Sequence, residues 1–322
     1  MIDGIGDLLA DDGFRTGLRF GVLAVLAAAL AGAVVRRMWG VWPLAGPAFV
    51  VAGLLAIDDA FTVERPMAVA VVVLVAGGLA ATWLHPLLWL VAAAPGAYLF
   101  VEATEIDDPS WAYATILATT LVGGLLMADF DKAHARTGLP PVMLAITVLG
   151  AYVTTPETQH IILLTGAALP LVLLGWPWPL GSLGVGGSFA ATAVVTWIVV
   201  VDGSFRPSAV VGGIASLGLF AIEPVVRRLR GGSGRAMPPV LAVAGLHLVV
   251  VGACSRVAGL RSSTTLALAI VAVVYAAAGV ALVALDRRAE AAALDAQAGV
   301  GSDDVMPPDR RPRGTSAFRH TG

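Results

Sequence analysis

His247 is the residue best placed to do chemistry inside a lipid bilayer. It lies midway along the apolar stretch 237–253, so the sequence predicts it near the centre of a membrane-spanning helix. An ionisable side chain at that depth is costly to bury, and such residues often relay protons or contact a substrate. A neutral imidazole that hydrogen-bonds a neighbouring helix is the alternative. His247 is therefore a candidate binding residue, with both interpretations open.

The segment TTPETQH at 154–160 is the most motif-like part of the chain. Glu157 and His160 are three residues apart and share one face of any helix that begins here, and a Glu-x-x-His pair can ligate a metal ion. Di-iron bundles need a second such pair and two further glutamates, whereas this sequence has one pair. Helix capping by threonine and proline explains the segment without a ligand. If a substrate or ion binds at this end, we expect Glu157, His160 and nearby Tyr152 to contact it.

A second polar segment, DFDKAHARTG at 129–138, brings Asp129, Asp131 and His134 close together in sequence. Carboxylate oxygens and an imidazole at this spacing could hold a divalent cation. The same residues would also suit an ordinary solvated turn, with the basic residues between them as counter-charges. These three are candidate metal ligands, and the sequence otherwise predicts no cofactor.

Glu223 closes the apolar stretch 207–223 and is a further candidate binding residue. Arg227 follows four residues later, a spacing that favours an ion pair on one helix face. That pair, at the membrane interface, is the simpler interpretation of Glu223. We expect Pro224 to end or kink the helix, because proline has no backbone N–H and its ring clashes with the preceding turn.

The composition excludes a soluble globular protein. Hydrophobic residues make up 58% of the chain, charged residues 13%, and the mean hydropathy is +0.86. A soluble domain carries about 25% charged residues. No soluble core could hide this much apolar surface, so the expected solvent and main partner is the lipid bilayer. The net charge of −2 gives no reason to expect a nucleic-acid partner.

The apolar stretches predict an all-α, polytopic transmembrane helix bundle. A helix needs about 20 mostly apolar residues to cross the hydrocarbon core. On this criterion we expect about eleven spans, with two more or two fewer left open. The predicted spans are 18–35, 38–57, 66–84, 86–102, 111–128, 139–155, 158–175, 178–201, 207–223, 237–253 and 264–285.

Basic residues predict the orientation, because cytoplasmic turns of membrane proteins are enriched in Lys and Arg. With the N-terminus outside and the C-terminus inside, the inner turns collect most of them. These are Arg36, Arg37, Lys132, Arg136, Arg227, Arg228, Arg230, Arg235, Arg287 and Arg288. Lys132 is the single lysine, and the excess of Arg, Ala, Gly and Val is typical of a GC-rich, prokaryotic genome. We therefore expect a multi-pass protein of a prokaryotic plasma membrane.

Three regions follow from this topology. Residues 1–17 form a short extracytoplasmic segment, 18–285 the transmembrane helical domain, and 286–322 a cytoplasmic tail. The stretch RRAEAAALDAQ, ending at Gln297, could extend the last helix. The remaining tail is rich in Pro, Gly and charge and is expected to be disordered.

Two sequence echoes suggest an internal duplication. The stretch LPPVMLAITVLGAYV at 139–153 resembles MPPVLAVAGLHLVVV at 237–251, and the segments that begin with WPL at 42 and at 178 end alike in Phe and Arg-Pro. Parallel repeats of this kind recur in secondary transporters. Proline at the first helical position and a biased composition would produce similar echoes without duplication.

Glycine and proline also predict broken helices. The candidates are the glycine-rich segment 181–187, Pro95-Gly96 and Pro170. Broken helices can expose backbone groups to a substrate cavity.

Three function classes remain after the common catalytic motifs are excluded. The sequence has no G-x-x-x-x-G-K-[ST], no H-E-x-x-H and no G-x-S-x-G. The leading hypothesis is transport or translocation of a small or lipid-linked substrate around His247 and Glu157. The second is a non-catalytic membrane subunit or scaffold in cell-envelope biosynthesis, assembled with membrane-protein partners or as a homo-oligomer. The third is a membrane-embedded enzyme that acts on a lipid-linked substrate.

Overall fold

The protein is an all-helical bundle. The computed structural model describes residues 8–39, 43–61, 63, 65–106, 110–154, 159–175, 181–202, 206–230, 240–259 and 263–303. Helices joined by turns account for these ranges, and no strand occurs within them. The predicted fold class, all-α, is confirmed.

Each predicted span overlaps at least one helix of the structure. In chain order the helices are α2 (Asp12–Trp39), α3 (Ala45–Ala60), α4 (Arg65–Ala81), α5 (Pro86–Glu102), α6 (Ser110–His134), α7 (Leu139–Thr154), α8 (Gln159–Ala168), α9 (Val172–Gly175), α10 (Val185–Asp202), α11 (Pro207–Ala215), α12 (Leu219–Leu229), α13 (Val240–Gly259) and α14 (Thr264–Asp303). A 3₁₀ turn at Leu169–Leu171 joins α8 to α9, and together they overlap the predicted span 158–175.

Length separates these helices into two groups. Four helical stretches are long and apolar enough to cross a membrane: Asp12–Val34, Ser110–Thr137, Val240–Val257 and Thr264–Asp295. The bent pair α11–α12 makes a fifth if it counts as one span. Helices α3, α4, α5, α7 and α10 have 16 to 18 residues. At about 1.5 Å per residue they fall just short of a hydrocarbon core about 30 Å thick. Length and composition therefore identify four or five spans among the described residues, fewer than the eleven expected.

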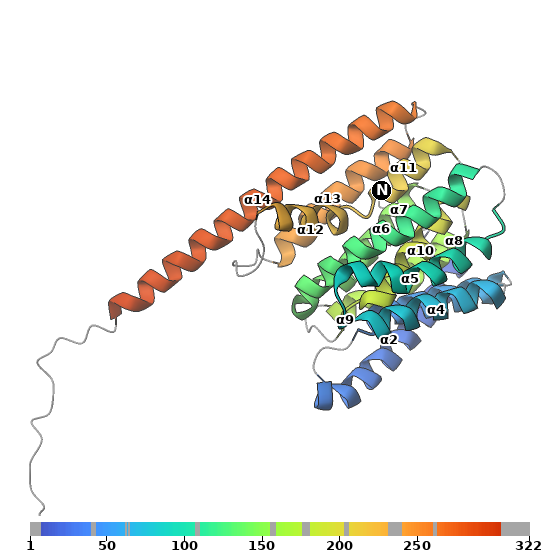
Figure 1. The fold of residues 1–322 in the computed structure, drawn as a ribbon, viewed down its shortest axis with the longest axis horizontal. Helices are drawn as coiled ribbons and strands as arrows, with labels where there is room; N and C mark the ends of the chain where they lie inside the picture. Colours follow the sequence, from blue (N-terminus) through green and yellow to red (C-terminus); the bar gives the residue numbers. More distant parts are fainter. Residues whose placement is uncertain are drawn as a thin grey trace, which may run out of the picture.

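Helix α10 lies at the centre of the bundle (Figure 1). All its side chains from Val185 to Val200 are buried except that of Trp197, which is half-buried. It packs most extensively on α6, then on α4 and α3. A helix without charged side chains along its length can be enclosed by other helices, and α10 has none between Val185 and Val201.

Paired glycines bring α3 and α4 against the start of α10. A Cβ atom added to Gly78 would lie 2.2 Å from the backbone nitrogen of Gly186, and one added to Gly46 would lie 2.7 Å from the Cα of Gly187. Helices in a membrane gain little from the hydrophobic effect when they associate, so close backbone approach at small residues supplies the packing energy. Gly46 of α3, Gly78 of α4 and the pair Gly186-Gly187 of α10 make these contacts.

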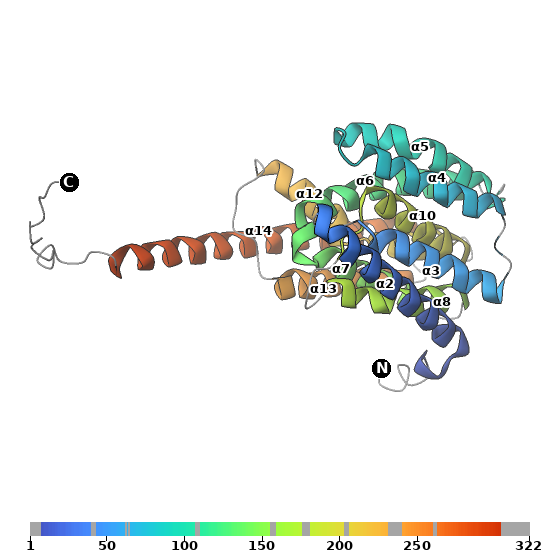
Figure 2. The same cartoon turned by 90° about the horizontal axis from the view of Figure 1, so that it is seen from below.

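Helices α2 and α14 lie on the outside of the bundle. Their outward apolar side chains include Leu30 and Val34 on α2, each 70% exposed, and Val273 and Val280 on α14. Figure 2 shows α14 extending well beyond the other helices. It runs to Asp303, so it includes the helical extension suggested through Gln297 and continues beyond it. A run of alanines without proline continues the helix there. At the other end, α2 begins at Asp12, inside the segment expected to precede the first span.

Side-chain contacts sort the turns into two groups. At one end of the bundle, His134 at the end of α6 contacts Glu223 of α12. Arg230, which directly follows α12, pairs there with Asp286 of α14. We call this the basic end, because it carries Lys132 and Arg227. At the other end, residues that follow α3 and α5 share a cavity with the start of α8 and with the last turns of α10. We call this the cavity end.

The helix is interrupted as expected at Pro170, by the 3₁₀ turn Leu169–Leu171, but the other observed breaks differ from those expected. Helix α5 continues through Pro95, and α12 continues through Pro224 to Leu229, so Pro224 does not end that helix. The break in this part of the chain comes earlier, between α11 and α12, where the axes bend by 58°. Gly218 there has a φ of +52°, a left-handed value that glycine adopts without steric cost. In the glycine-rich segment 181–187, residues 181–184 are not helical, and α10 begins at Val185 without a further break.

The α4–α10 contact gives a test of the packing. Gly78→Ala would force a methyl group against the backbone of Gly186, which cannot rotate away as a side chain would. We expect a loss of about 1–3 kcal/mol of stability, typical of overpacking, and a lower unfolding temperature in detergent. Gly245 on α13 is the matched control, since nothing lies within 4 Å of an added Cβ there. Gly245→Ala should unfold at or above the wild-type temperature, and equal unfolding temperatures for both variants would contradict this packing.

Candidate functional site

His247 is fully buried and hydrogen-bonded on both ring nitrogens. Its Nε2 lies 3.1 Å from the carbonyl oxygen of Met143 and 3.1 Å from Oγ1 of Thr147, both on α7. Its Nδ1 accepts a hydrogen bond of 3.2 Å from the backbone N–H of Leu219, at the start of α12. The imidazole of α13 thus lies between α7 and the break that separates α11 from α12.

These bonds fix the tautomer of His247. The N–H of Leu219 can only donate, so Nδ1 must be unprotonated. The carbonyl of Met143 can only accept, so Nε2 must carry the proton. The ring is therefore a neutral imidazole, protonated on Nε2, with both of its nitrogens satisfied.

His247 is one of three side chains that bond the backbone released at the break. Thr147 donates from Oγ1 to the carbonyl of Ser216 at 3.1 Å, and Tyr275 of α14 donates from its hydroxyl to the carbonyl of Ala215 at 2.9 Å. An unbonded backbone group in an apolar interior costs several kcal/mol. The geometry supports the interpretation of His247 as a hydrogen-bonding partner of neighbouring helices, and it lines none of the cavities described below.

An ion-pair cluster links α6 to α12 at the basic end. Asp129 Oδ2 lies 2.9 Å from Arg227 and 3.2 Å from Arg228. Arg227 also binds Glu223 at 3.1 Å, which is the pair expected from their four-residue spacing. His134 Nε2 lies 3.2 Å from Oε1 of Glu223, and its ring packs on Phe130 with centroids 4.3 Å apart. Glu223 of α12 thus belongs to a network of charged and polar side chains that joins α12 to α6.

Asp131 turns away from this cluster toward the start of α10. Its two carboxylate oxygens accept hydrogen bonds from the backbone N–H groups of Leu183 at 2.7 Å and Gly184 at 2.9 Å. A carboxylate beside a helix N-terminus satisfies free N–H groups and complements the helix dipole. Asp131 therefore caps the central helix from a neighbouring one.

The three candidate metal ligands thus do not converge. Asp129 faces arginines, Asp131 faces the N-terminus of α10, and His134 faces Glu223. In the part of the chain that the structure describes, no group of three or more His, Cys, Asp or Glu side chains could hold a metal ion.

A row of buried hydroxyl groups runs along α10 from Asp131. Ser188, Thr192 and Thr196 follow one another at four-residue intervals, so they share one face of the helix, and all are buried. This face meets α6, since Thr192 Oγ1 lies 3.8 Å from the sulfur of Met127. On α6, Thr120 is also buried, and its hydroxyl has no hydrogen-bond partner within the described ranges. The α6–α10 interface is therefore polar over several turns.

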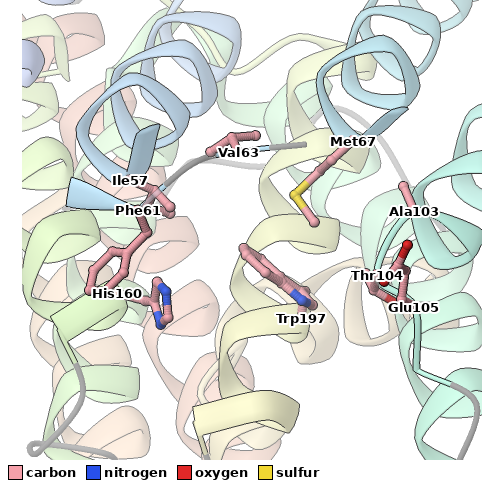
Figure 3. Close-up of a pocket in the computed structure, with 9 residues that line it drawn as sticks. All are labelled: Ile57, Phe61, Val63, Met67, Ala103, Thr104, Glu105, His160 and Trp197. Atoms are coloured by element: carbon pink, nitrogen blue, oxygen red, sulfur yellow. The ribbon is translucent and has the colours of Figure 1, made fainter. Parts of the chain in front are cut away.

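A cavity of about 190 Å³ lies next to Trp197, toward the same end of α10 as Thr196 (Figure 3). Aromatic rings line one part of it: the His160 ring lies 4.6 Å from that of Phe61 and 6.1 Å from that of Trp197, between centroids. Glu105 lines another part and has a φ of +51°, a strained value for a residue other than glycine. Such strain often occurs at functional sites.

His160, one of the candidate binding residues, lines this cavity. Tyr152 is half-buried and is not among the lining residues, and Glu157 lies outside the described residues. No local sequence pattern predicted that Phe61 and Trp197 would meet His160, because they come from different helices and turns. Thr147 and Tyr275 were missed for the same reason.

No protein-family model matches the sequence, and no curated protein matches it.

The break supplies a test of the role of His247. His247→Leu would leave the N–H of Leu219 and the carbonyl of Met143 without these bonds. Each buried group left unbonded costs about 1–3 kcal/mol, so we expect a clear drop in the unfolding temperature in detergent. His160→Leu is the control, since that ring borders a cavity and not a helix break. An unfolding temperature for His247→Leu equal to that of the control would contradict the structural role.

Proposed function

We propose that this chain is a membrane protein that translocates a small polar substrate along the α6–α10 interface. The observation that carries the proposal is the buried hydroxyl row, which begins near Asp131 at one end of α10 and ends at Thr196, one residue before the cavity-lining Trp197. A substrate that leaves water must exchange its hydrogen bonds for others. The hydroxyls of Ser188 and Thr192 each donate to the backbone carbonyl four residues earlier, so their oxygens can accept such bonds, and the unpartnered hydroxyl of Thr120 can donate one.

The topology that we propose has eleven spans, with the N-terminus outside and the C-terminus in the cytoplasm of a prokaryotic cell. The shorter helices then cross the bilayer together with the long ones, with small adjustments of bilayer thickness. The distribution of charge supports this orientation. Lys132, Arg227 and Arg287 lie toward the basic end, which the positive-inside rule assigns to the cytoplasm, whereas Arg65 lies at the cavity end beside Glu102 and Glu105.

The bent pair α11–α12 provides a hinge for such a protein. Helix α11 contacts α10, and α12 contacts α6, so the two halves of the bent pair touch the two sides of the proposed path. A change of the 58° bend would move α6 relative to α10. Motion about a few helix-terminal residues is a common route to alternating access.

The alternative function is a non-catalytic membrane subunit in cell-envelope biosynthesis. Dense packing favours it: His247 is fully buried, and the glycine contacts around α10 leave no room for side chains. A membrane-embedded enzyme gains less support, because Asp129 and Glu223 are both held in ion pairs with Arg227.

Thiol labelling in proteoliposomes distinguishes the first two functions without knowledge of the substrate. In a Cys254→Ala background, Thr192→Cys places a thiol on the hydroxyl row, and Val194→Cys places one on another face of α10. A translocation path must be wet in at least one state. We therefore expect a small cationic methanethiosulfonate reagent to modify the Thr192→Cys protein at least about tenfold faster than the Val194→Cys protein.

The Val194→Cys protein is the control for the Thr192→Cys protein, and equal labelling of the two is the outcome that would contradict translocation. Both native residues are buried, so burial alone predicts equal, slow modification. That result would contradict translocation along α10 and favour the subunit function.

A further inference from the structure

A groove of about 580 Å³ runs between α12 and α14 toward the basic end of the bundle. One face of α14 lines it, at the three- and four-residue spacing of a single helical stripe that ends in Arg287. On α12, Leu229 and Arg230 line the opposite side.

The walls of the groove are apolar and uncovered. Leu229 is 83% exposed and Val280 is 71% exposed. Gly279 widens the floor, because a Cβ atom there would approach only the side chains of Val226, at 3.6 Å, and Ile222, at 3.9 Å. A groove with such walls offers an aliphatic chain van der Waals contacts along its length.

The end of the groove at the basic end is cationic. Arg230 is held by two acids of α14, Asp286 and, at 3.7 Å, Glu290. Arg287 borders the same groove, is exposed, and makes no ion pair with any residue that the structure describes. One positive charge is therefore available where the apolar walls end.

Size and charge select the occupant. From Ala276 to Arg287 the groove follows α14 for about 16 Å, at about 1.5 Å per residue. A partner helix about 10 Å across would need about 1,300 Å³ over that length, more than the groove holds. An acyl chain is thinner, and a phosphate group pairs well with an arginine.

We propose that this groove binds an anionic phospholipid, with an acyl chain along Leu229, Gly279 and Val280 and the phosphate at Arg287. Basic pockets between membrane helices on the cytoplasmic side are suited to anionic headgroups. The proposal requires only that α12 and α14 lie in a membrane, and it is independent of translocation along α10. A lipid in this position would join α12 to α14 and so brace one half of the bent pair.

Lipid titration of the full-length protein in detergent tests the headgroup contact. Phosphatidylglycerol should raise the wild-type unfolding temperature in a saturable manner. Arg287→Gln should weaken the apparent affinity about tenfold, as expected for the loss of a charge-assisted hydrogen bond. Arg288→Gln is the matched control, because this neighbour carries the same charge but does not line the groove. It should keep the wild-type affinity within about twofold.

A second variant tests the acyl-chain contact. Gly279→Phe should fold, since the contacts around Gly279 are of ordinary van der Waals length, and should abolish the shift by filling the groove. Gly245→Phe, in open space on α13, should retain it.

Three outcomes would overturn the proposal. An equal shift with phosphatidylcholine would show a lipid effect without headgroup recognition. An equal shift with glycerol phosphate alone would show a free-phosphate site. Wild-type affinity in Arg287→Gln would show that the phosphate binds elsewhere.

Discussion

A bent helix inside an apolar bundle needs hydrogen-bond partners for the backbone groups that the bend releases, and this requirement organises one half of the structure. The carbonyls of Ala215 and Ser216 accept hydrogen bonds from Tyr275 and Thr147, and the N–H of Leu219 donates one to His247. These three side chains come from α14, α7 and α13, so a single break holds three further helices in register. Loss of His247 would leave the N–H of Leu219 without this acceptor in an apolar surrounding, where an unbonded polar group is most costly.

The other half of the structure is organised by the enclosure of α10. Glycine contacts bring α3 and α4 against its first turns, and Asp131 of α6 bonds to the N–H groups just before it. The hydroxyl row of α10 therefore faces α6, starting from the end of α10 that Asp131 contacts. The two halves meet where α12 is tied to α6 through Arg227 and Asp129. A change in the angle between α11 and α12 would consequently shift α6 relative to α10. This coupling links the helix break to the proposed translocation.

Local patterns in the sequence predicted the helices and the Glu223–Arg227 pair, because both depend on residues a few positions apart. The break at Gly218 was not predicted, and of the two effects expected of Pro224, to end or to kink its helix, the first does not occur. The reason is distance along the chain: Thr147 and Ser216 are 69 positions apart, and His247 and Met143 are 104 apart. A single sequence carries no signal for such pairs. The same limit explains why the sequence offered a metal ligand or a solvated turn residue for Asp131 and did not predict that it caps α10.

His247 serves as a neutral hydrogen-bonding partner of the helix break. Nitrogen NMR of the ¹⁵N-histidine-labelled protein in bilayers tests it most directly, since the two ring nitrogens give distinct signals in each tautomer. His247→Leu would assign the signal by its loss. We expect one neutral imidazole species, with the proton on Nε2 and an unprotonated Nδ1 that accepts a hydrogen bond from the N–H of Leu219. A proton on Nδ1, or a ring protonated on both nitrogens, would contradict it.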